Sequence, residues 1–187
     1  MAEVNKFQIV KLKDIISDND LNEYYMPRIL NFSCLNNDVE MFLKNKAASY
    51  ECRGKSCTYL VVDSLNGEIL AYYTLSLKSI DFDESVSKSV IKSIDGFSKD
   101  VSSIAVILIG QLGKNSIYKN KIIGKELLSL ALGTVYSAKD ILGGRICLLE
   151  IEDTECNEKV VDFYRDNGFK ILQHDKTDRF IQMFRKL

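Results

Sequence analysis

Two stretches of the sequence contain residues that can bind a phosphate-bearing molecule and move a proton. The first is IGQLGKNSIYKNKIIGKELL, residues 109–128, in which an apolar strand leads through a short loop into an amphipathic helix. The first turn of a helix offers unpaired backbone N–H groups and the positive end of the helix dipole, and both attract phosphate oxygens. Lys119, Lys121 and Lys125 can add positive charge there. An ordinary strand–loop–helix connection with solvated lysines explains this segment equally well.

The second stretch is NEKVVDFYRDNGF, residues 157–169, a short helix that ends at an Asn-Gly pair, a favoured left-handed stop. A phenol such as that of Tyr164 can donate a proton to a departing thiolate, and positioned acid catalysis contributes roughly 10²–10⁴-fold to a rate. The alternative is that Phe163 and Tyr164 are core aromatic residues of the helix. The helix, its stop and the strand that follows occur together, which favours the functional interpretation.

The other reactive residues give no support to metal or cysteine chemistry. The five cysteines are odd in number and form no C-x-x-C pair, so reduced thiols in a cytosolic protein are expected. The single histidine, His174, lies between two apparent strands, where we expect a solvated turn residue and no zinc site. Cys34 has no histidine partner, and we expect it to be a small buried hydrophobic residue.

Length, composition and charge predict one cytoplasmic globular domain. The chain has 187 residues and 21.3 kDa, with 46% hydrophobic and 27% charged residues, which suits a single domain spanning residues 1–187. A net charge of −1 creates no global field toward nucleic acid or anionic lipid, so a nucleic-acid partner would need a local basic patch. No apolar run approaches the roughly 20 residues that cross a bilayer, and the N-terminus lacks the pattern of an export signal. We therefore expect no membrane partner.

Hydrophobic periodicity predicts the elements that position these residues. A turn is expected at SLNG, between the second and third strands. The Ser-, Asp- and Lys-rich segment 79–101 is expected to be a partly helical surface insertion, and the strand after it to be buried on both faces. The order of elements predicts an α+β fold, a sandwich around a mixed sheet. The expected strands are 6–12, 58–63, 68–77, 104–112, 145–151, 169–173 and 179–185, and the expected helices are 18–30, 36–50, 120–142 and 157–167.

This order and both stretches resemble the GNAT N-acetyltransferase family. In that family a strand, a loop and a helix start meet around the pyrophosphate of acyl-CoA, with the pattern Gln/Arg-x-x-Gly-x-Gly/Ala. Residues 119–124 align with the pattern, where Gly124 is kept and Ile122 replaces the internal glycine. Residues 157–169 resemble the family stretch N-x-x-A-x-x-F-Y-x-x-x-G-F, whose tyrosine faces the thioester and whose asparagine lies near the pantetheine arm. The resemblance covers about residues 31–187 and implies a mixed, mostly antiparallel sheet flanked by helices.

The resemblance implies an N-acetyltransferase that uses acetyl-CoA and no metal, with direct attack of a primary amine on the thioester in a ternary complex. Tyr164 would be the general acid, and backbone N–H groups at 112–114 would polarise the thioester oxygen. Glu150 is a weak candidate for the base, and an ordinary carboxylate at a strand edge is the preferred explanation for it. The residues implied to bind the cofactor are Leu112, Gly113, Lys114, Lys119, Asn120, Lys121, Ile122, Ile123, Gly124, Lys125, Asn157 and Tyr164.

A third, partial resemblance links residues 31–47 and the later LAYYTL to the acetyltransferase toxins of toxin–antitoxin pairs. Leu35 and Ala71 stand where that subgroup has glycines, and Gln111 where an arginine is frequent. We rank an N-acetyltransferase with an unidentified amine acceptor first. A toxin that acetylates aminoacyl-tRNA comes second, because the lysines available for tRNA are already assigned to the cofactor. An inactive GNAT-like binding module, suggested by Ile122, and a homodimer both stay open.

Overall fold

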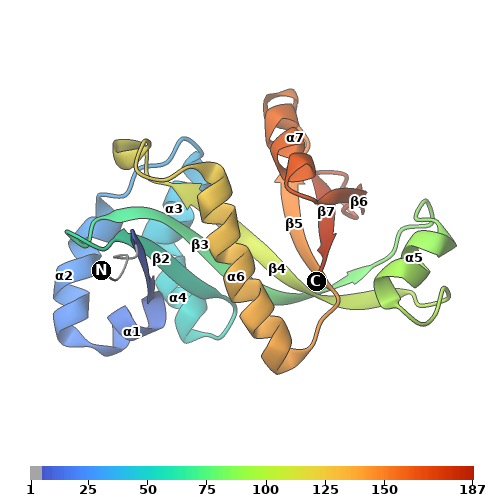
Figure 1. Ribbon diagram of the computed structural model, residues 1–187, viewed down its shortest axis with the longest axis horizontal. Coiled ribbons are helices and arrows are strands. Elements are labelled where there is room, and N and C mark those ends of the chain that lie inside the picture. Colours follow the sequence, from blue (N-terminus) through green and yellow to red (C-terminus); the bar gives the residue numbers. More distant parts are fainter. Residues whose placement is uncertain (1–5) are drawn as a thin grey trace, which may run out of the picture. The chain divides into compact units, whose positions relative to one another are not determined.

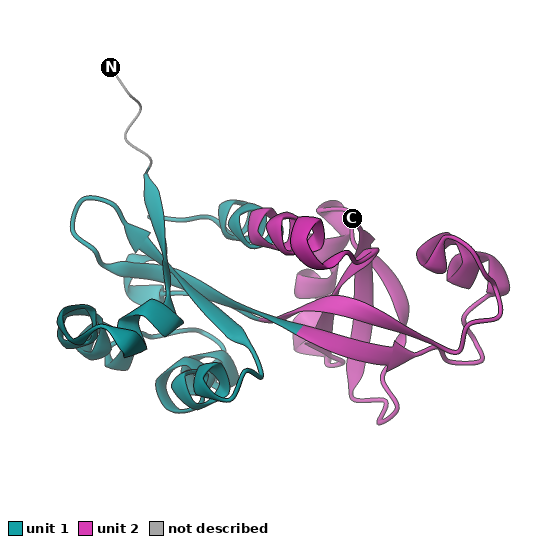
Figure 2. Ribbon diagram, turned by 90° about the horizontal axis from the view of Figure 1, so that it is seen from below, with its two compact units in different colours: residues 1–76, 111–132 teal, residues 77–110, 133–187 magenta. Residues whose placement is uncertain are grey.

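The computed structural model describes residues 6–187; residues 1–5, part of the N-terminal segment examined for an export signal, lie outside the described part. The chain forms two compact units, Met1–Ser76 with Gln111–Leu132, and Leu77–Gly110 with Gly133–Leu187 (Figure 2). Both units are discontinuous in sequence. Strands β3 and β4 and helix α6 each contribute residues to both, and the expectation of a single domain stays a prediction.

Seven strands form one mixed sheet in the order β1-β2-β3-β4-β5-β7-β6 (Figure 1). Antiparallel pairing joins β1 to β2, β2 to β3, β5 to β7 and β6 to β7, whereas β4 and β5 run parallel and pair at Ile107–Ile109 and Cys147–Leu149. The expected α+β class with a mixed, mostly antiparallel sheet flanked by helices is confirmed. The strands are β1 Phe7–Lys11, β2 Cys57–Asp63, β3 Ile69–Asp81, β4 Ser103–Lys114, β5 Ile146–Glu152, β6 Lys170–His174 and β7 Phe180–Lys186.

In the first unit, four helices cover one core that includes Phe32, Leu60 and Tyr72. They are α1 Leu12–Ser17, α2 Asn19–Leu30, α3 Asn37–Asn45 and α4 Ala47–Cys52. The expected caps are present, because the side chains of Asp18 and Asn36 accept hydrogen bonds from backbone N–H groups two to three residues further on.

Two expectations for these helices were wrong. Helix α1 was missed because it is six residues long, follows β1 directly and begins without a side-chain cap. The single helix expected at 36–50 is two helices, because the backbone of Lys46 departs from ideal helical values with a φ of −118° and Ala47 then starts α4 as a fully buried residue.

In the second unit, the segment expected to be a surface insertion contributes to a core. Strand β3 continues to Asp81, and α5 Lys88–Asp95 follows it. Ile80 and Ile94 are buried with residues of β4, β5 and β7. The segment is partly helical as expected, but it also buries Val86 and Ile91, so it is more than a surface excursion, although Phe97 is 94% exposed.

The elements that flank the candidate residues differ from the expectation at their ends. Burial of β4 on both faces holds for Val106 and Ile107, whereas Gly110 is exposed. Helix α6 is Gly124–Leu142, four residues shorter at its start than expected, because the preceding residues form a loop. Helix α7, Glu158–Asp166, ends as expected, with Gly168 at a φ of 86°.

Candidate functional site

The loop between β4 and α6 is built on Asn115, a polar residue that is 3% exposed. The Asn115 N–H donates to the carbonyl of Leu70 at 2.8 Å, and its side-chain Nδ2 donates to the carbonyl of Ile69 at 2.8 Å. The Asn115 Oδ1 accepts from the N–H of Ile117 at 3.1 Å, which caps the short helix η1 Ser116–Tyr118. One buried amide therefore joins the end of β4 to the start of β3 and initiates the loop.

Lys114, the last residue of β4, contacts the far end of the loop through its side chain. The Lys114 Nζ donates to the carbonyl of Ile122 at 3.0 Å and lies 3.4 Å from the carbonyl of Lys119. The side chain of Ile122 is fully buried at 0% exposure. Because that side chain is directed into the core, an isoleucine in place of the family glycine does not obstruct the solvent-facing side of the loop.

The start of α6 has one of its N–H groups occupied by a carboxylate. The N–H of Ile123 donates to Glu126 Oε2 at 2.9 Å, and this bond lowers the pKa of the Glu126 carboxyl. The next N–H groups, of Gly124 and Lys125, belong to the first helical turn, which leaves them without an intrahelical acceptor. These are the donors that the helix start can offer to a phosphate.

The lysines of the loop are not equivalent. Lys121 Nζ lies 3.2 Å from Asp63 Oδ2, whose side chain is only 9% exposed, so its charge is largely compensated. Lys119, Asn120 and Lys125 are exposed. Lys119 and Lys125 therefore remain as sources of positive charge toward an anion in solution.

Gly113 is tightly packed in β4. A Cβ built on it would lie 2.5 Å from Val39 Cγ1 and 3.1 Å from Tyr72 Cε1. The preceding Leu112 is half-buried. The close packing against α3 is by itself a reason for glycine at position 113. The glycine is therefore no evidence that its backbone N–H binds the donor.

Tyr164 lies in α7 among aromatic and sulfur-containing neighbours. Its residue is 8% exposed, and its ring centroid lies 5.6 Å from that of Phe169 and 5.1 Å from that of Phe163. Burial raises the pKa of the phenol well above its ordinary value, and the nearby Cys147 raises it further. Tyr164 therefore stays protonated at neutral pH, and its packing among these rings fits the core-aromatic alternative.

Asn157 has a local partner that the sequence did not indicate. The Asn157 Nδ2 donates to the carbonyl of Glu152 at 2.9 Å, which closes the turn η2 Glu155–Asn157 before α7. Its side-chain oxygen caps no helical N–H. The residue thus supports the connection from β5 to α7, and a contact with a cofactor stays a prediction.

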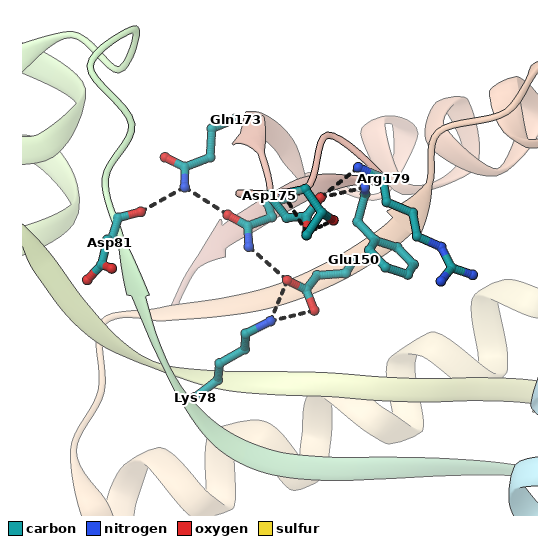
Figure 3. A network of polar contacts seen from close by, with 9 residues as sticks. Lys78, Asp81, Glu150, Gln173, Asp175 and Arg179 are labelled. Carbon is teal, nitrogen blue, oxygen red and sulfur yellow. Dashed lines mark hydrogen bonds and ion pairs between the residues drawn. The ribbon is translucent and has the colours of Figure 1, made fainter.

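Glu150 belongs to a polar network on the sheet (Figure 3). Both carboxylate oxygens accept from Lys78 Nζ, at 2.6 and 2.7 Å, and Oε1 also accepts from Gln182 Nε2 at 2.7 Å. The buried Gln173 continues the network, since its Nε2 donates to Gln182 Oε1 at 2.9 Å and to the carbonyl of Asp81 at 2.8 Å. Three of its about four acceptor positions are thus occupied by donors of the sheet, which supports the preferred explanation of an ordinary structural carboxylate.

The remaining reactive residues have structural explanations. Cys34 is half-buried and burial raises the pKa of its thiol, so it is no activated nucleophile. His174 is exposed at the end of β6, and its Nε2 lies 3.0 Å from Asp153 Oδ2. Within residues 6–187, no cluster of His, Cys, Asp or Glu side chains is suited to hold a metal ion. No helix of that part is long and apolar enough to cross a bilayer.

Sequence reasoning missed the residues that hold the loop. Asn115 follows a strand and precedes a short helix, so its capping role left a weak signal in the sequence. Asp63 contacts Lys121, 58 positions away, and Glu68 contacts Tyr118, 50 positions away. Contacts between residues so far apart left no signal in the sequence.

Solved structures identify the fold. No family model and no curated protein sequence matches the chain. AtaT complexed with acetyl-methionyl-tRNAfMet matches with a TM-score of 0.70 and 23% identity, over 96% of this chain and 94% of that one. A tyrosine-to-phenylalanine mutant of the AtaT toxin matches with a TM-score of 0.71 and 21% identity, over 100% and 92%. The chain has the fold of these toxins. The GNAT-like fold expected from the sequence is confirmed.

Two further structures extend the comparison. A tyrosine-to-phenylalanine mutant of KacT matches with a TM-score of 0.69 and 21% identity, over 97% of this chain and 95% of that one. AtaTR bound with acetyl-CoA matches with a TM-score of 0.64 and 18% identity, over 98% and 94%. The likeness therefore extends over nearly the whole length of both chains.

Proposed function

We propose that this protein is an acetyl-CoA-dependent N-acetyltransferase whose acceptor is the amino group of an aminoacyl-tRNA. The observation that carries the proposal is the fold match over 96% of the chain to AtaT complexed with acetyl-methionyl-tRNAfMet. The match to AtaTR bound with acetyl-CoA supports the donor. The toxin alternative, ranked second on the sequence alone, thus becomes the preferred one.

The loop between β4 and α6 is proposed to hold the pyrophosphate of the donor. The N–H groups of Gly124 and Lys125 would donate to phosphate oxygens, and the ammonium groups of Lys119 and Lys125 would add charge. The burial of Ile122 supports this assignment, because the isoleucine that stands in place of the glycine does not crowd the exposed side of the loop. Asn157 is proposed to lie near the pantetheine arm.

The reaction needs donors to the thioester oxygen, a general acid for the thiolate and an acceptor for the amine proton. Backbone N–H groups of residues 112–114 would stabilise the negative charge that develops on the thioester oxygen when the amine attacks the carbonyl carbon. As the carbon–sulfur bond breaks, Tyr164 would transfer its proton to the CoA thiolate. The amine loses a proton to ordered water in this scheme, since Lys78 and Gln182 already occupy the Glu150 carboxylate.

Transfer of a labelled acetyl group to purified charged tRNA tests this function. The purified protein is incubated with labelled acetyl-CoA and separate pools of charged tRNA, uncharged tRNA, protein and small amines. We expect label on the amino acid of charged tRNA, and the Tyr164→Phe variant to lower kcat by roughly 10–10³-fold with little change in the KM for acetyl-CoA. Label that appears only in the protein or small-amine pools would overturn the acceptor. An undiminished kcat in Tyr164→Phe would leave Tyr164 as a packing residue.

A further inference from the structure

The turn between β2 and β3 contacts the loop 115–123, here called the cofactor loop, through side chains. The Tyr118 hydroxyl donates to Glu68 Oε2 at 2.9 Å. The other oxygen of Glu68, Oε1, lies 3.4 Å from Arg28 Nε, close enough for an ion pair, although the geometry is not that of a hydrogen bond. A carboxylate outside the loop therefore connects a tyrosine of η1 to a helix of the first unit.

Arg28 is held by two contacts with Tyr24, and it in turn restrains the Glu68 carboxylate. Its guanidinium carbon lies 3.8 Å from the centroid of the Tyr24 ring, and its NH1 donates to the Tyr24 carbonyl at 2.7 Å. The Tyr24 hydroxyl donates to the carbonyl of Asn66 in the β2–β3 turn at 2.9 Å. The side chains of Arg28 and Glu68 are 28% and 29% exposed, so the pair is partly shielded from water.

Tyr118 also makes backbone hydrogen bonds within the loop, so its contact with Glu68 restrains the loop backbone. Its N–H donates to the Asn115 carbonyl at 3.1 Å, and its own carbonyl accepts from the N–H of Lys121 at 2.8 Å. Residues 119–123 follow directly and lead into Gly124, the first residue of α6. Tyr118, together with Asn115 and Lys114, therefore helps to fix where the following N–H groups lie.

We propose that Glu68 and Tyr118 are positioning residues for phosphate binding, which hold the cofactor loop in the conformation that presents the N–H groups of α6 to the donor. This inference rests on the proposed function, because it takes the pyrophosphate of acetyl-CoA as the ligand of that helix start. The contact lies directly before residues 119–124, because the Tyr118 hydroxyl donates to Glu68 and the Tyr118 carbonyl accepts from the N–H of Lys121.

Tyr118→Phe and Glu68→Ala remove the bond from opposite sides, and Glu68→Gln keeps an oxygen that can accept from the phenol. Loss of one hydrogen bond to a partly shielded carboxylate is expected to raise the Kd for CoA and the KM for acetyl-CoA about 5–20-fold, with kcat changed less than about twofold. Glu68→Gln should retain most of the affinity. Tyr136→Phe and Glu84→Gln remove matched groups from exposed positions away from the loop and should leave Kd unchanged.

Acetyl-pantetheine, a donor without phosphates, separates positioning from general loss of structure. The KM for this donor should be the same in wild type, Tyr118→Phe and Glu68→Ala, because the loop no longer has a phosphate to bind. An equal rise in KM for both donors, or a Kd for CoA within twofold of wild type in Tyr118→Phe, would overturn the positioning role. Absence of CoA binding by the wild-type protein would instead overturn the proposed function, so the two failures are distinguishable.

Discussion

Replacement of Gly113 by alanine is expected to destabilise the protein through one identifiable collision. The new Cβ would lie 2.5 Å from Val39 Cγ1 and 3.1 Å from Tyr72 Cε1, whereas carbon atoms in contact are normally about 3.5–4.0 Å apart. Val39 lies in α3, where a β-branched side chain has one strongly preferred rotamer, so rotation relieves little of the overlap. Overpacking of this kind costs about 1–3 kcal/mol. For a chain of this size, the expected loss in Tm is about 2–12 °C.

Val39→Ala provides the matched test, because it removes the atom that the new Cβ would meet. Alone, it should cost about 1–2 kcal/mol from the lost methyl groups. Combined with Gly113→Ala, it should cost clearly less than the sum of the two single changes, with a coupling of about 1–2 kcal/mol in urea unfolding followed by circular dichroism. Costs that add to within about 0.5 kcal/mol would refute the collision. A fully stable Gly113→Ala variant with a raised KM for acetyl-CoA would show that the glycine serves the donor instead.

Three further results are expected. Gly133 lies in the middle of α6 with open space where the methyl group of an alanine would lie, so Gly133→Ala should raise the free energy of unfolding by about 0.5–1 kcal/mol, and an unchanged or lower urea midpoint would contradict this. Burial raises the pKa of Cys147 to about 12, so a thiol reagent at pH 8 should modify exposed Cys52 and Cys156 rapidly and Cys147 only on unfolding, as peptide mapping would show. The Thr177 hydroxyl, with backbone N–H donors, lowers the pKa of Asp175 to about 2. The stability lost in Asp175→Asn should therefore be largest above the ordinary pKa of about 3.9, decrease below it and disappear only as the pH falls through about 2. A difference independent of pH would exclude the carboxylate charge as its cause.

Local signals in the sequence predicted the elements that have strong caps and turns. The Asn-Gly stop placed the end of α7 correctly, and the cap at Asp18 placed the start of α2. Both signals depend on residues adjacent in the chain. The break between α3 and α4 had no such signal, and Ala47, the first residue of α4, is buried in a core that includes residues of β2 and β3.

The site was predictable only in part for the same reason. A strand, a loop and a helix start were expected at residues 109–128, and the structure has all three. The direction of the Ile122 side chain could not be inferred, since it depends on the path of a loop held by Asn115 and Lys114. The contacts of the Glu150 carboxylate depend on Lys78, which is 72 residues away.

The contacts of the cofactor loop weaken the argument for an inactive binding module. That alternative rested on the replacement of an internal glycine by Ile122, which suggested that phosphates could no longer approach the backbone. Glycine is needed where a side chain would block the approach or where φ must be positive. Neither condition applies here, because the Ile122 side chain is buried and Ile122 is not among the residues with positive φ. The loop can therefore dispense with the glycine as long as polar contacts from β3 and the β2–β3 turn, through Asn115 and Tyr118, fix its path.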